Sequence, residues 1–205
     1  MTEKNFRAQL NWHDYLKDWL GLSSVFNDGK SGTGFTRSYG TNPALITRID
    51  GWGGDADLIL VTASLNDGGG NNADLPLGQL SDTGTGTSYF ADCRAVAEKL
   101  LTKYPNTPIG FITALPRGSA QDRGKTYGVD GWYHPWCEAL KTVCAHYSLP
   151  CLDLYHSGTL RPWLAANNAA FFSCSAAPEG DGIHPNAAGQ EIMARRIMPF
   201  VEQYL

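Results

Sequence analysis

The hydrophobic positions of this chain follow two spacings, one typical of helices and one typical of short buried strands. Apolar side chains recur every three to four residues in five segments, which predicts amphipathic helices over 12–22, 42–50, 88–104, 132–147 and 187–204. Short apolar runs predict strands at 25–26, 58–63, 108–114 and 150–154. Because helices separate most of these strands, the order predicts an α/β fold with a parallel sheet covered on both sides. In the last helix, the predicted buried face comprises Ile192, Ile197, Phe200, Val201 and Tyr204.

Polar and glycine-rich segments follow several of the predicted strands. A glycine-rich turn spans 27–34, Asn66-Asp67 opens a polar insertion over 68–87, and a predicted loop over 155–185 contains Asp181 and His184. In open parallel sheets, ligands bind beyond the carboxyl ends of the strands. The candidate site is therefore expected where these segments meet.

Length and composition limit the classes of protein. With 205 residues and 42% hydrophobic content, the chain is expected to form a single domain over 1–205. The formal net charge of −4 and the absence of a basic run argue against nucleic acid or an anionic membrane as the partner. The longest apolar stretch, 58–61, is too short for a transmembrane segment, and 1–7 lacks the apolar core of a signal peptide.

The five cysteines predict free or buried thiols, because they form no close CxxC pair. Such thiols favour a reducing, cytoplasmic compartment, although an export signal upstream of Met1 would place the protein outside the cell. Cys137 and Cys144 lie beside His134 and His146 in sequence, but they are seven residues apart on a predicted helix, which is core spacing. The sequence therefore predicts no metal site.

The most informative segment is Asp181-Gly-Ile-His184-Pro185, which precedes the last predicted helix. A carboxylate three residues before a histidine, in a turn stiffened by glycine and proline, positions a base together with the acid that orients it. Such a pair is useful where a nucleophile lies within hydrogen-bond reach of the imidazole.

Taken in order, these segments resemble the blocks of the SGNH (GDSL-type) hydrolases, a family of serine esterases and lipases. The resemblance covers the chain from Trp12 to the C-terminus, and the Asp-x-x-His-Pro block is its most specific part. It implies a three-layer α/β/α fold with a parallel sheet of flavodoxin-like type. The matching segments are Asn27–Gly32, Ser64–Asp67, Asp153–Tyr155, Asp181–Pro185, and Asn186 with Gly189.

Two positions depart from the family pattern. Ser64 replaces the glycine of Gly-x-Asn-Asp, which is tolerable if the backbone there does not need a positive φ. The larger departure is the absence of the first block, a central strand that ends in Gly-Asp-Ser and supplies the nucleophile. We expect the chain to start too late, with that serine upstream of Met1. Ser31 is an internal alternative, but it lacks the strand–turn–helix context of an exposed nucleophile.

The resemblance implies the chemistry of ester cleavage without a cofactor. His184 would be the general base, Asp181 would orient it, and the oxyanion would be bound by the backbone N–H of Gly32 and the amide of Asn66. The expected substrate is a small-molecule or carbohydrate ester, with a short acyl or O-acetyl group. Loop aromatic residues that would stack on a sugar are Trp132 and Trp163.

Other interpretations of the same residues stay open. The chain is alternatively an inert carbohydrate-binding or assembly module on this fold, or one part of a split enzyme completed by a separate strand. Asn66-Asp67-Gly68 is also a turn signature, in which Asp67 caps or braces its own loop.

Overall fold

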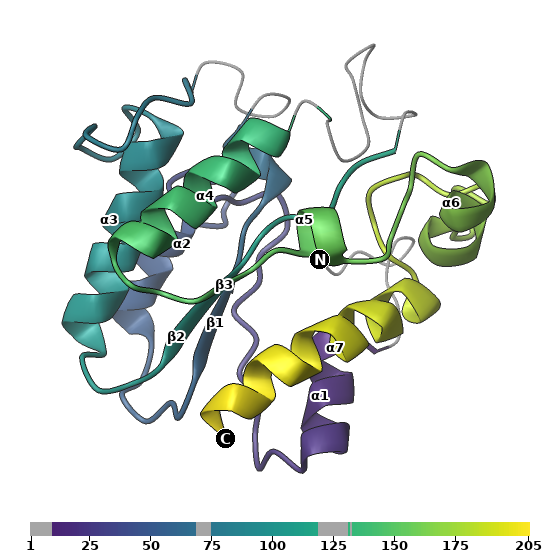
Figure 1. Cartoon of the computed structure of the whole chain (residues 1–205), viewed down its shortest axis with the longest axis horizontal. Coiled ribbons are helices and arrows are strands. Elements are labelled where there is room, and N and C mark those ends of the chain that lie inside the picture. Colours follow the sequence, from purple (N-terminus) through teal and green to yellow (C-terminus); the bar gives the residue numbers. More distant parts are fainter. Residues whose placement is uncertain (1–9, 69–74, 119–130, 132) are drawn as a thin grey trace. The chain divides into compact units, whose positions relative to one another are not determined.

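The computed structural model describes residues 10–68, 75–118, 131 and 133–205, and its contacts group into two compact units. Unit 1 comprises Met1–Ser31, Leu115–Gly131 and Leu154–Leu205, and unit 2 comprises Gly32–Ala114 and Trp132–Asp153. The prediction of a single domain over 1–205 stays a prediction. Figure 1 shows the elements of both units coloured along the chain.

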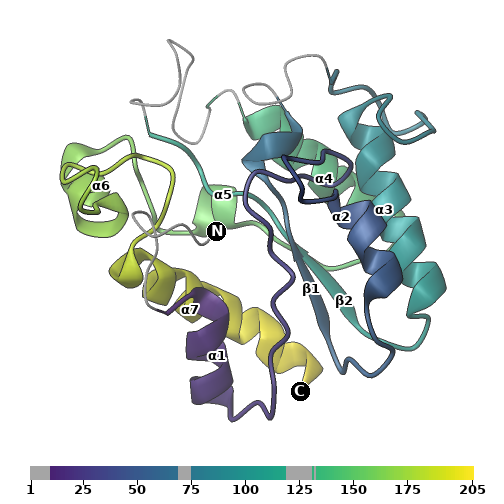
Figure 2. The same ribbon diagram turned by 180° about the vertical axis from the view of Figure 1, so that it is seen from behind.

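Unit 2 contains a parallel sheet of three strands in the order β1-β2-β3 (Figures 1 and 2). The strands are β1 (Ile59–Thr62), β2 (Ile109–Ile112) and β3 (Cys151–Leu152). In the register, Ile59 pairs with Ile109 and Phe111 pairs with Cys151. The predicted α/β class and the predicted strands at 58–63, 108–114 and 150–154 are confirmed, although each strand is shorter than its apolar run.

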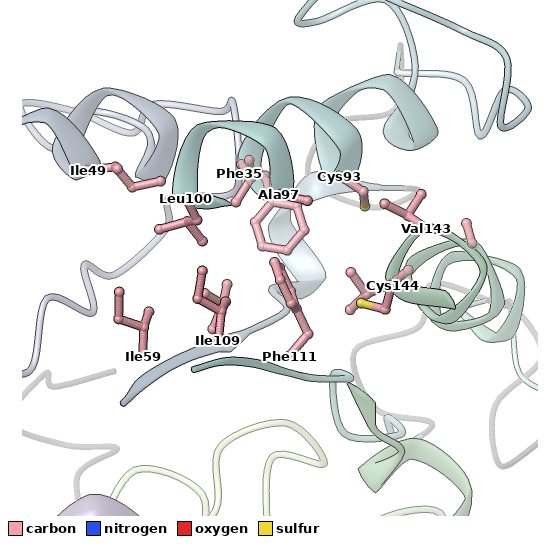
Figure 3. Close-up of a cluster of buried hydrophobic side chains, with 14 of the residues drawn as sticks. Phe35, Ile49, Ile59, Cys93, Ala97, Leu100, Ile109, Phe111, Val143 and Cys144 are labelled. Carbon is pink, nitrogen blue, oxygen red and sulfur yellow. The ribbon is translucent and has the colours of Figure 1, made fainter. Parts of the chain in front are cut away.

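Helices of unit 2 lie over one face of this sheet (Figure 3). The longest are α3 (Tyr89–Lys103) and α4 (His134–His146); α2 (Leu45–Arg48) is short and continues into the 3₁₀ turn η1 (Ile49–Gly51). The Ser88 side chain caps α3 by accepting from the backbone N–H of Ala91. The apolar core between helices and sheet contains the fully buried Ile49, Leu100, Phe111 and Leu140. Burying each such side chain contributes about 1.5–3 kcal/mol.

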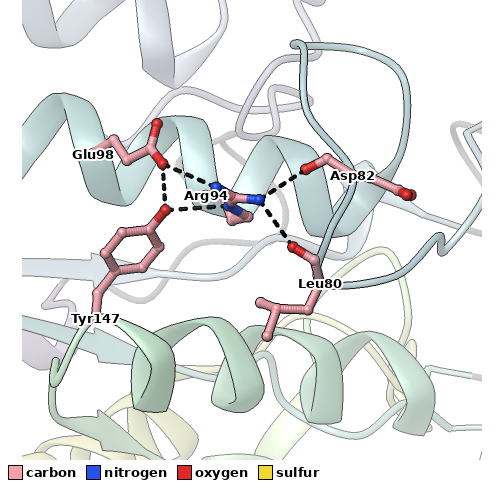
Figure 4. A network of polar contacts seen from close by, with 5 residues as sticks. All are labelled: Leu80, Asp82, Arg94, Glu98 and Tyr147. Atoms are coloured by element: carbon pink, nitrogen blue, oxygen red, sulfur yellow. Dashed lines mark hydrogen bonds and ion pairs between the residues drawn. The ribbon is translucent and has the colours of Figure 1, made fainter.

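A polar network around Arg94 of α3 holds the segment before that helix (Figure 4). The Arg94 guanidinium donates to the carbonyls of Leu80 and Asp82, at 3.0 and 3.2 Å, and to the hydroxyl of Tyr147 at 3.1 Å. Glu98 accepts from Arg94 and from the Tyr147 hydroxyl. Because the network joins three segments, the described part of the polar insertion is anchored without regular secondary structure.

Unit 1 contains the helices α1 (Trp12–Leu20), α5 (Leu154–Ser157), α6 (Ala165–Phe172) and α7 (Ala187–Val201), the last continuing into η4 (Glu202–Tyr204). The backbone N–H of Trp12 donates to the Gln190 side chain at 3.1 Å, which ties α1 to α7. The α1 helix ends earlier than predicted because Gly21 adopts a left-handed conformation with φ +63°. On α7, the predicted burial of Ile197, Phe200 and Val201 is confirmed, whereas Ile192 and Tyr204 are only partly buried.

Two sequence predictions in unit 1 were wrong. The apolar pair Val25-Phe26 forms no strand, and Phe26 is 80% exposed. Two apolar residues set no register without a neighbouring strand, and none of the described strands pairs with them. The predicted loop over 155–185 contains most of α5 and all of α6. The alanine- and asparagine-rich α6 lacks the spaced large apolar residues by which sequence patterns reveal a helix. None of the described helices is long and apolar enough to cross a membrane.

Candidate active site

The Asp181–His184 turn of unit 1 lies between α6 and α7 and is held by backbone contacts. The N–H of Asp181 donates to the Phe172 carbonyl at 3.2 Å, and the N–H of Gly118 donates to the Gly182 carbonyl at 2.8 Å. Gly182 has φ +71°, and a Cβ there would lie 2.9 Å from the Cα of Gly118. The turn therefore needs glycine at 182, both for its backbone conformation and for this close approach.

Within that turn, one carboxylate accepts three hydrogen bonds. The Asp181 Oδ1 accepts from the backbone N–H groups of Ile183 and His184, both at 2.8 Å. Its Oδ2 lies 2.5 Å from the His184 Nδ1. Because a carboxylate only accepts, the Nδ1 carries the proton, and in neutral imidazole the Nε2 is then the basic atom. The structure thus brings together the two residues predicted as base and orienting acid.

The electrostatics of the pair follow from its hydrogen bonds. Burial of Asp181, which is 6% exposed, acts to raise its pKa, but the bonds from the His184 ring and from the backbone N–H groups of His184 and Ile183 outweigh burial. The pKa of Asp181 is therefore held below its usual value. The His184 side chain is 31% exposed, so solvent or a ligand reaches the imidazole while its partner stays inside.

The start of α7 fixes the turn from its other side. The Asn186 side chain accepts from the Gly189 N–H at 3.1 Å and donates to the Ala170 carbonyl at 3.1 Å. A Cβ on Gly189 would lie 2.6 Å from the Phe171 carbonyl oxygen. The Asn-x-x-Gly sequence therefore has a structural role here. Asn186 caps α7, and Gly189 lets α6 pack against the first turn of α7.

Unit 2 contains the two residues predicted to bind an oxyanion. The Asn66 side-chain amide donates to the Thr33 carbonyl at 3.1 Å, and Thr33 is the residue after Gly32. This bond uses one of the two N–H groups of the Asn66 amide. Because the amide is planar, the bond also sets the plane in which the second N–H lies. Ser64 has φ −110°, so the backbone needs no glycine there, and the Ser64 hydroxyl accepts from the Asn66 N–H at 3.0 Å. The departure at Ser64 is thus accommodated.

Gly32 is enclosed by residues that sequence reasoning did not single out. It has φ +76°, and a Cβ there would lie 2.3 Å from the Tyr39 ring. Its carbonyl accepts from the Arg37 guanidinium at 2.5 Å, and that guanidinium lies 5.4 Å from the centre of the Tyr39 ring. Arg37 and Tyr39 follow the glycine turn without a motif of their own, so only the folded loop reveals their contact with Gly32.

The remaining sequence candidates are less informative. Trp163 is partly exposed in unit 1 just before α6, whereas Trp132 lies outside the described residues. Asp181 and His184 belong to unit 1, and Gly32 and Asn66 belong to unit 2. The assembly of both pairs into one site, and the source of the nucleophile, stay predictions.

Comparison with known proteins identifies related chains. Residues 2–192 match the model of the GDSL-like Lipase/Acylhydrolase family. A solved structure from Lactobacillus plantarum is 27% identical, with a TM-score of 0.78 over 97% of this chain and 90% of that one. A possible lipase from Chitinophaga pinensis is 18% identical, with a TM-score of 0.69 over 96% and 89%. A carbohydrate acetylesterase family member from Sinorhizobium meliloti is 15% identical, with a TM-score of 0.53 over 95% and 86%. No curated protein matches.

The family match covers nearly the whole chain, and the solved structures share its α/β fold. The resemblance inferred from the glycine turn, Asn66-Asp67 and the Asp181–Pro185 block is thereby confirmed. The chain belongs to the GDSL-like lipase/acylhydrolase family, a family of ester hydrolases.

Proposed function

We propose that this protein is a serine-dependent ester hydrolase that removes short acyl groups, with O-acetyl groups on carbohydrates as the favoured substrate class. The observation that carries the proposal is the Asp181–His184 pair, in which a buried carboxylate fixes the tautomer of a partly exposed imidazole. Such a pair is the base and orienting acid of nucleophilic acyl transfer.

In the proposed reaction, the Nε2 of His184 takes the proton of a serine hydroxyl as the serine oxygen attacks the ester carbonyl. The resulting oxyanion accepts hydrogen bonds from the Gly32 N–H and the Asn66 amide. The imidazolium, stabilised by Asp181, returns its proton to the leaving alcohol, and an acyl-enzyme remains. Water then attacks the acyl-enzyme with the same assistance, which releases the acid and restores the serine.

The nucleophile is proposed to be a serine hydroxyl, as the Ser-His-Asp mechanism requires. The Asp181–His184 pair supports this proposal, because a tautomer-fixed base has its use beside a hydroxyl or thiol nucleophile.

The preference for a short acyl group on a sugar rests on two supports. A structural relative is a carbohydrate acetylesterase family member, and Trp163 offers a partly exposed indole in the unit that contains His184. An aromatic ring stacks on the apolar face of a sugar.

The test is hydrolysis of p-nitrophenyl acetate, p-nitrophenyl octanoate and acetylated xylo-oligosaccharides by the protein from the complete open reading frame. We expect turnover of the acetyl substrates above that of the octanoate, and its loss in His184→Ala. The matched control is His146→Ala, which removes an exposed histidine from the end of α4. Turnover that survives His184→Ala contradicts the assigned role. Sugar affinity without turnover, unchanged in His184→Ala, supports the inert binding module instead.

A further inference from the structure

A fully buried carboxyl in unit 2 lies against the loop that follows Gly32. Asp67 is 0% exposed, and its Oδ1 accepts from the backbone N–H of Phe35 at 2.6 Å. A Cβ on Gly34 would lie 1.9 Å from that same oxygen. The backbone at 34–35 therefore approaches the carboxyl as closely as a glycine permits.

This loop connects the two proposed oxyanion donors, because it directly follows Gly32 and is hydrogen-bonded to Asn66. Asn66 donates from its side chain to the Thr33 carbonyl, and the next residue, Asp67, accepts from the Phe35 N–H. The consecutive side chains of Asn66 and Asp67 thus hold the segment directly after Gly32. Asn66 binds a backbone carbonyl of that segment, and Asp67 binds a backbone N–H. The far side of the loop is tied to α2, because the N–H of Leu45 donates to the Gly34 carbonyl at 3.0 Å.

The turn that contains Asp67 is itself held in place by aromatic side chains. Residues Leu65–Asp67 form the 3₁₀ turn η2, and the Tyr133 hydroxyl donates to the Ser64 carbonyl at its start. At its end, a Cβ on Gly68 would lie 2.0 Å from the Trp136 indole nitrogen. The rings of Tyr133 and Trp136 stack with centroids 5.8 Å apart. Side chains at and near the start of α4 therefore pack against η2 and prevent it from moving away from the 33–36 loop.

We propose that Asp67 is a positioning residue for oxyanion binding, because its buried carboxyl holds the 33–36 backbone and so sets where the Gly32 and Asn66 donors lie. The proposal rests on the ester-hydrolase function above. Asp67 acts through the loop and touches no reacting atom, which separates its role from that of Asp181.

The protonation of this carboxyl makes the proposal testable by pH. Burial raises the pKa of Asp67 to about 7, the backbone N–H groups of Phe35 and Thr36 oppose that rise, and the neighbouring Asp92 adds to it. The other titratable or charged groups that face it are Tyr89 and Cys93 of α3, Tyr133 and Arg37.

Three variants separate positioning from general stability. Asp67→Asn keeps an oxygen acceptor for the Phe35 N–H but cannot titrate, and Asp67→Ala removes the acceptor. Asp92→Asn is the matched control, since Asp92 is also 0% exposed but bonds the Thr36 hydroxyl and the Gly86 N–H instead of the loop backbone at Phe35.

The first readout needs no turnover. In the protein from the complete open reading frame, the backbone amide NMR resonances of Gly32 and Phe35 and the side-chain amide resonances of Asn66 are expected to shift with a midpoint near pH 7. These shifts should vanish in Asp67→Asn. In Asp92→Asn they should persist with a lower midpoint, because the Asp92 carboxylate adds to the rise in the pKa of Asp67. Shifts that persist in Asp67→Asn, or that are absent from the unmodified chain, overturn the proposal.

The second readout is kinetic, on the protein from the complete open reading frame. A misplaced loop should lower kcat in Asp67→Ala by about ten- to a hundredfold, with KM changed less than about threefold. Asp67→Asn should recover most of kcat but lose the step near pH 7 from its pH profile. A folded Asp67→Ala with normal kcat, or an equal loss in Asp92→Asn, overturns the positioning role. If the unmodified protein shows the NMR titration but no turnover, the ester-hydrolase proposal fails, and the bracing of the loop by Asp67 stands.

Discussion

Asp67 and Asp181 are both buried aspartates that hold a loop of the proposed site, yet the pKa values of their carboxyl groups are shifted in opposite directions. Asp181 accepts from two backbone N–H groups and from the His184 ring, and its pKa is held below the usual value. Burial raises the pKa of Asp67 to about 7, opposed mainly by the Phe35 N–H and increased by the nearby Asp92. Burial alone therefore does not set the charge of a carboxyl, because the number of donors that reach it also matters.

The largest expected effect comes from removing the charge of Asp181 while keeping its shape. In Asp181→Asn, the amide oxygen can still accept from the N–H groups of Ile183 and His184. The amide nitrogen then faces the His184 Nδ1, which favours the wrong imidazole tautomer. We expect kcat to fall by about 10⁴-fold, with the fold retained. Steady-state kinetics on acetyl esters measure kcat, and circular dichroism measures whether the fold is retained. A loss of kcat below about tenfold contradicts the orienting role.

The two aspartates should give opposite pH dependences of the free energy of unfolding. Between about pH 4 and 7, folded Asp67 keeps a proton that the unfolded chain loses, so its contribution to stability falls as pH rises. The steepest slope is about 1.4 kcal/mol per pH unit for one such group. For Asp181 the contribution is present above the usual pKa of about 4 and is lost as pH falls through its lowered folded value.

Urea unfolding at pH 5, 6, 7 and 8 measures the Asp67 contribution. The variant Asp67→Asn should flatten the decline and be more stable than the unmodified protein at pH 8. Identical slopes for the unmodified protein and Asp67→Asn would sink the assignment of the titration to Asp67.

A smaller effect is expected when the space beside Asp67 is filled. In Gly34→Ala, the new methyl group would overlap the Asp67 Oδ1, so the loop or η2 must shift. Overpacking of a buried site costs about 1–3 kcal/mol of stability. Gly40→Ala is a poor match because Gly40 has positive φ, whereas Gly51→Ala adds a methyl group in open space and serves as the control. Chemical denaturation compares the two, and equal destabilisation contradicts the close contact.

The smallest effect concerns Ser64, the residue that replaces the family glycine. Ser64→Gly removes the hydroxyl that accepts from the Asn66 N–H and leaves the short turn with more backbone freedom. We expect a loss of about 0.5–1.5 kcal/mol in the free energy of unfolding, with KM unchanged. A gain in stability would show that the hydroxyl does not help hold Asn66.

Sequence reasoning identified the elements whose signals are local and strong. The apolar runs at 58–63 and 108–114 contain strands of the sheet, and Asp181 and His184 form a hydrogen-bonded pair, as the turn between them indicates. It failed at Val25-Phe26, because a strand of two residues is defined by partners rather than by its own composition.

The role of Asp67 could be predicted only in part. A turn signature at Asn66-Asp67-Gly68 suggested a brace, but the braced segment lies more than thirty residues earlier in the chain, at Phe35. The same holds for Arg37 and Tyr39 around Gly32, whose contacts depend on how the loop closes. Contacts between segments distant in sequence follow from packing, which no local pattern encodes.

The most direct test of the proposed serine chemistry is covalent labelling of the protein from the complete open reading frame with a fluorophosphonate, followed by mass-spectrometric mapping. The account predicts stoichiometric labelling of one serine, and loss of that labelling in His184→Ala. No labelling of the unmodified protein, or labelling that is equally fast in His184→Ala, would contradict a serine nucleophile activated by the Asp181–His184 pair.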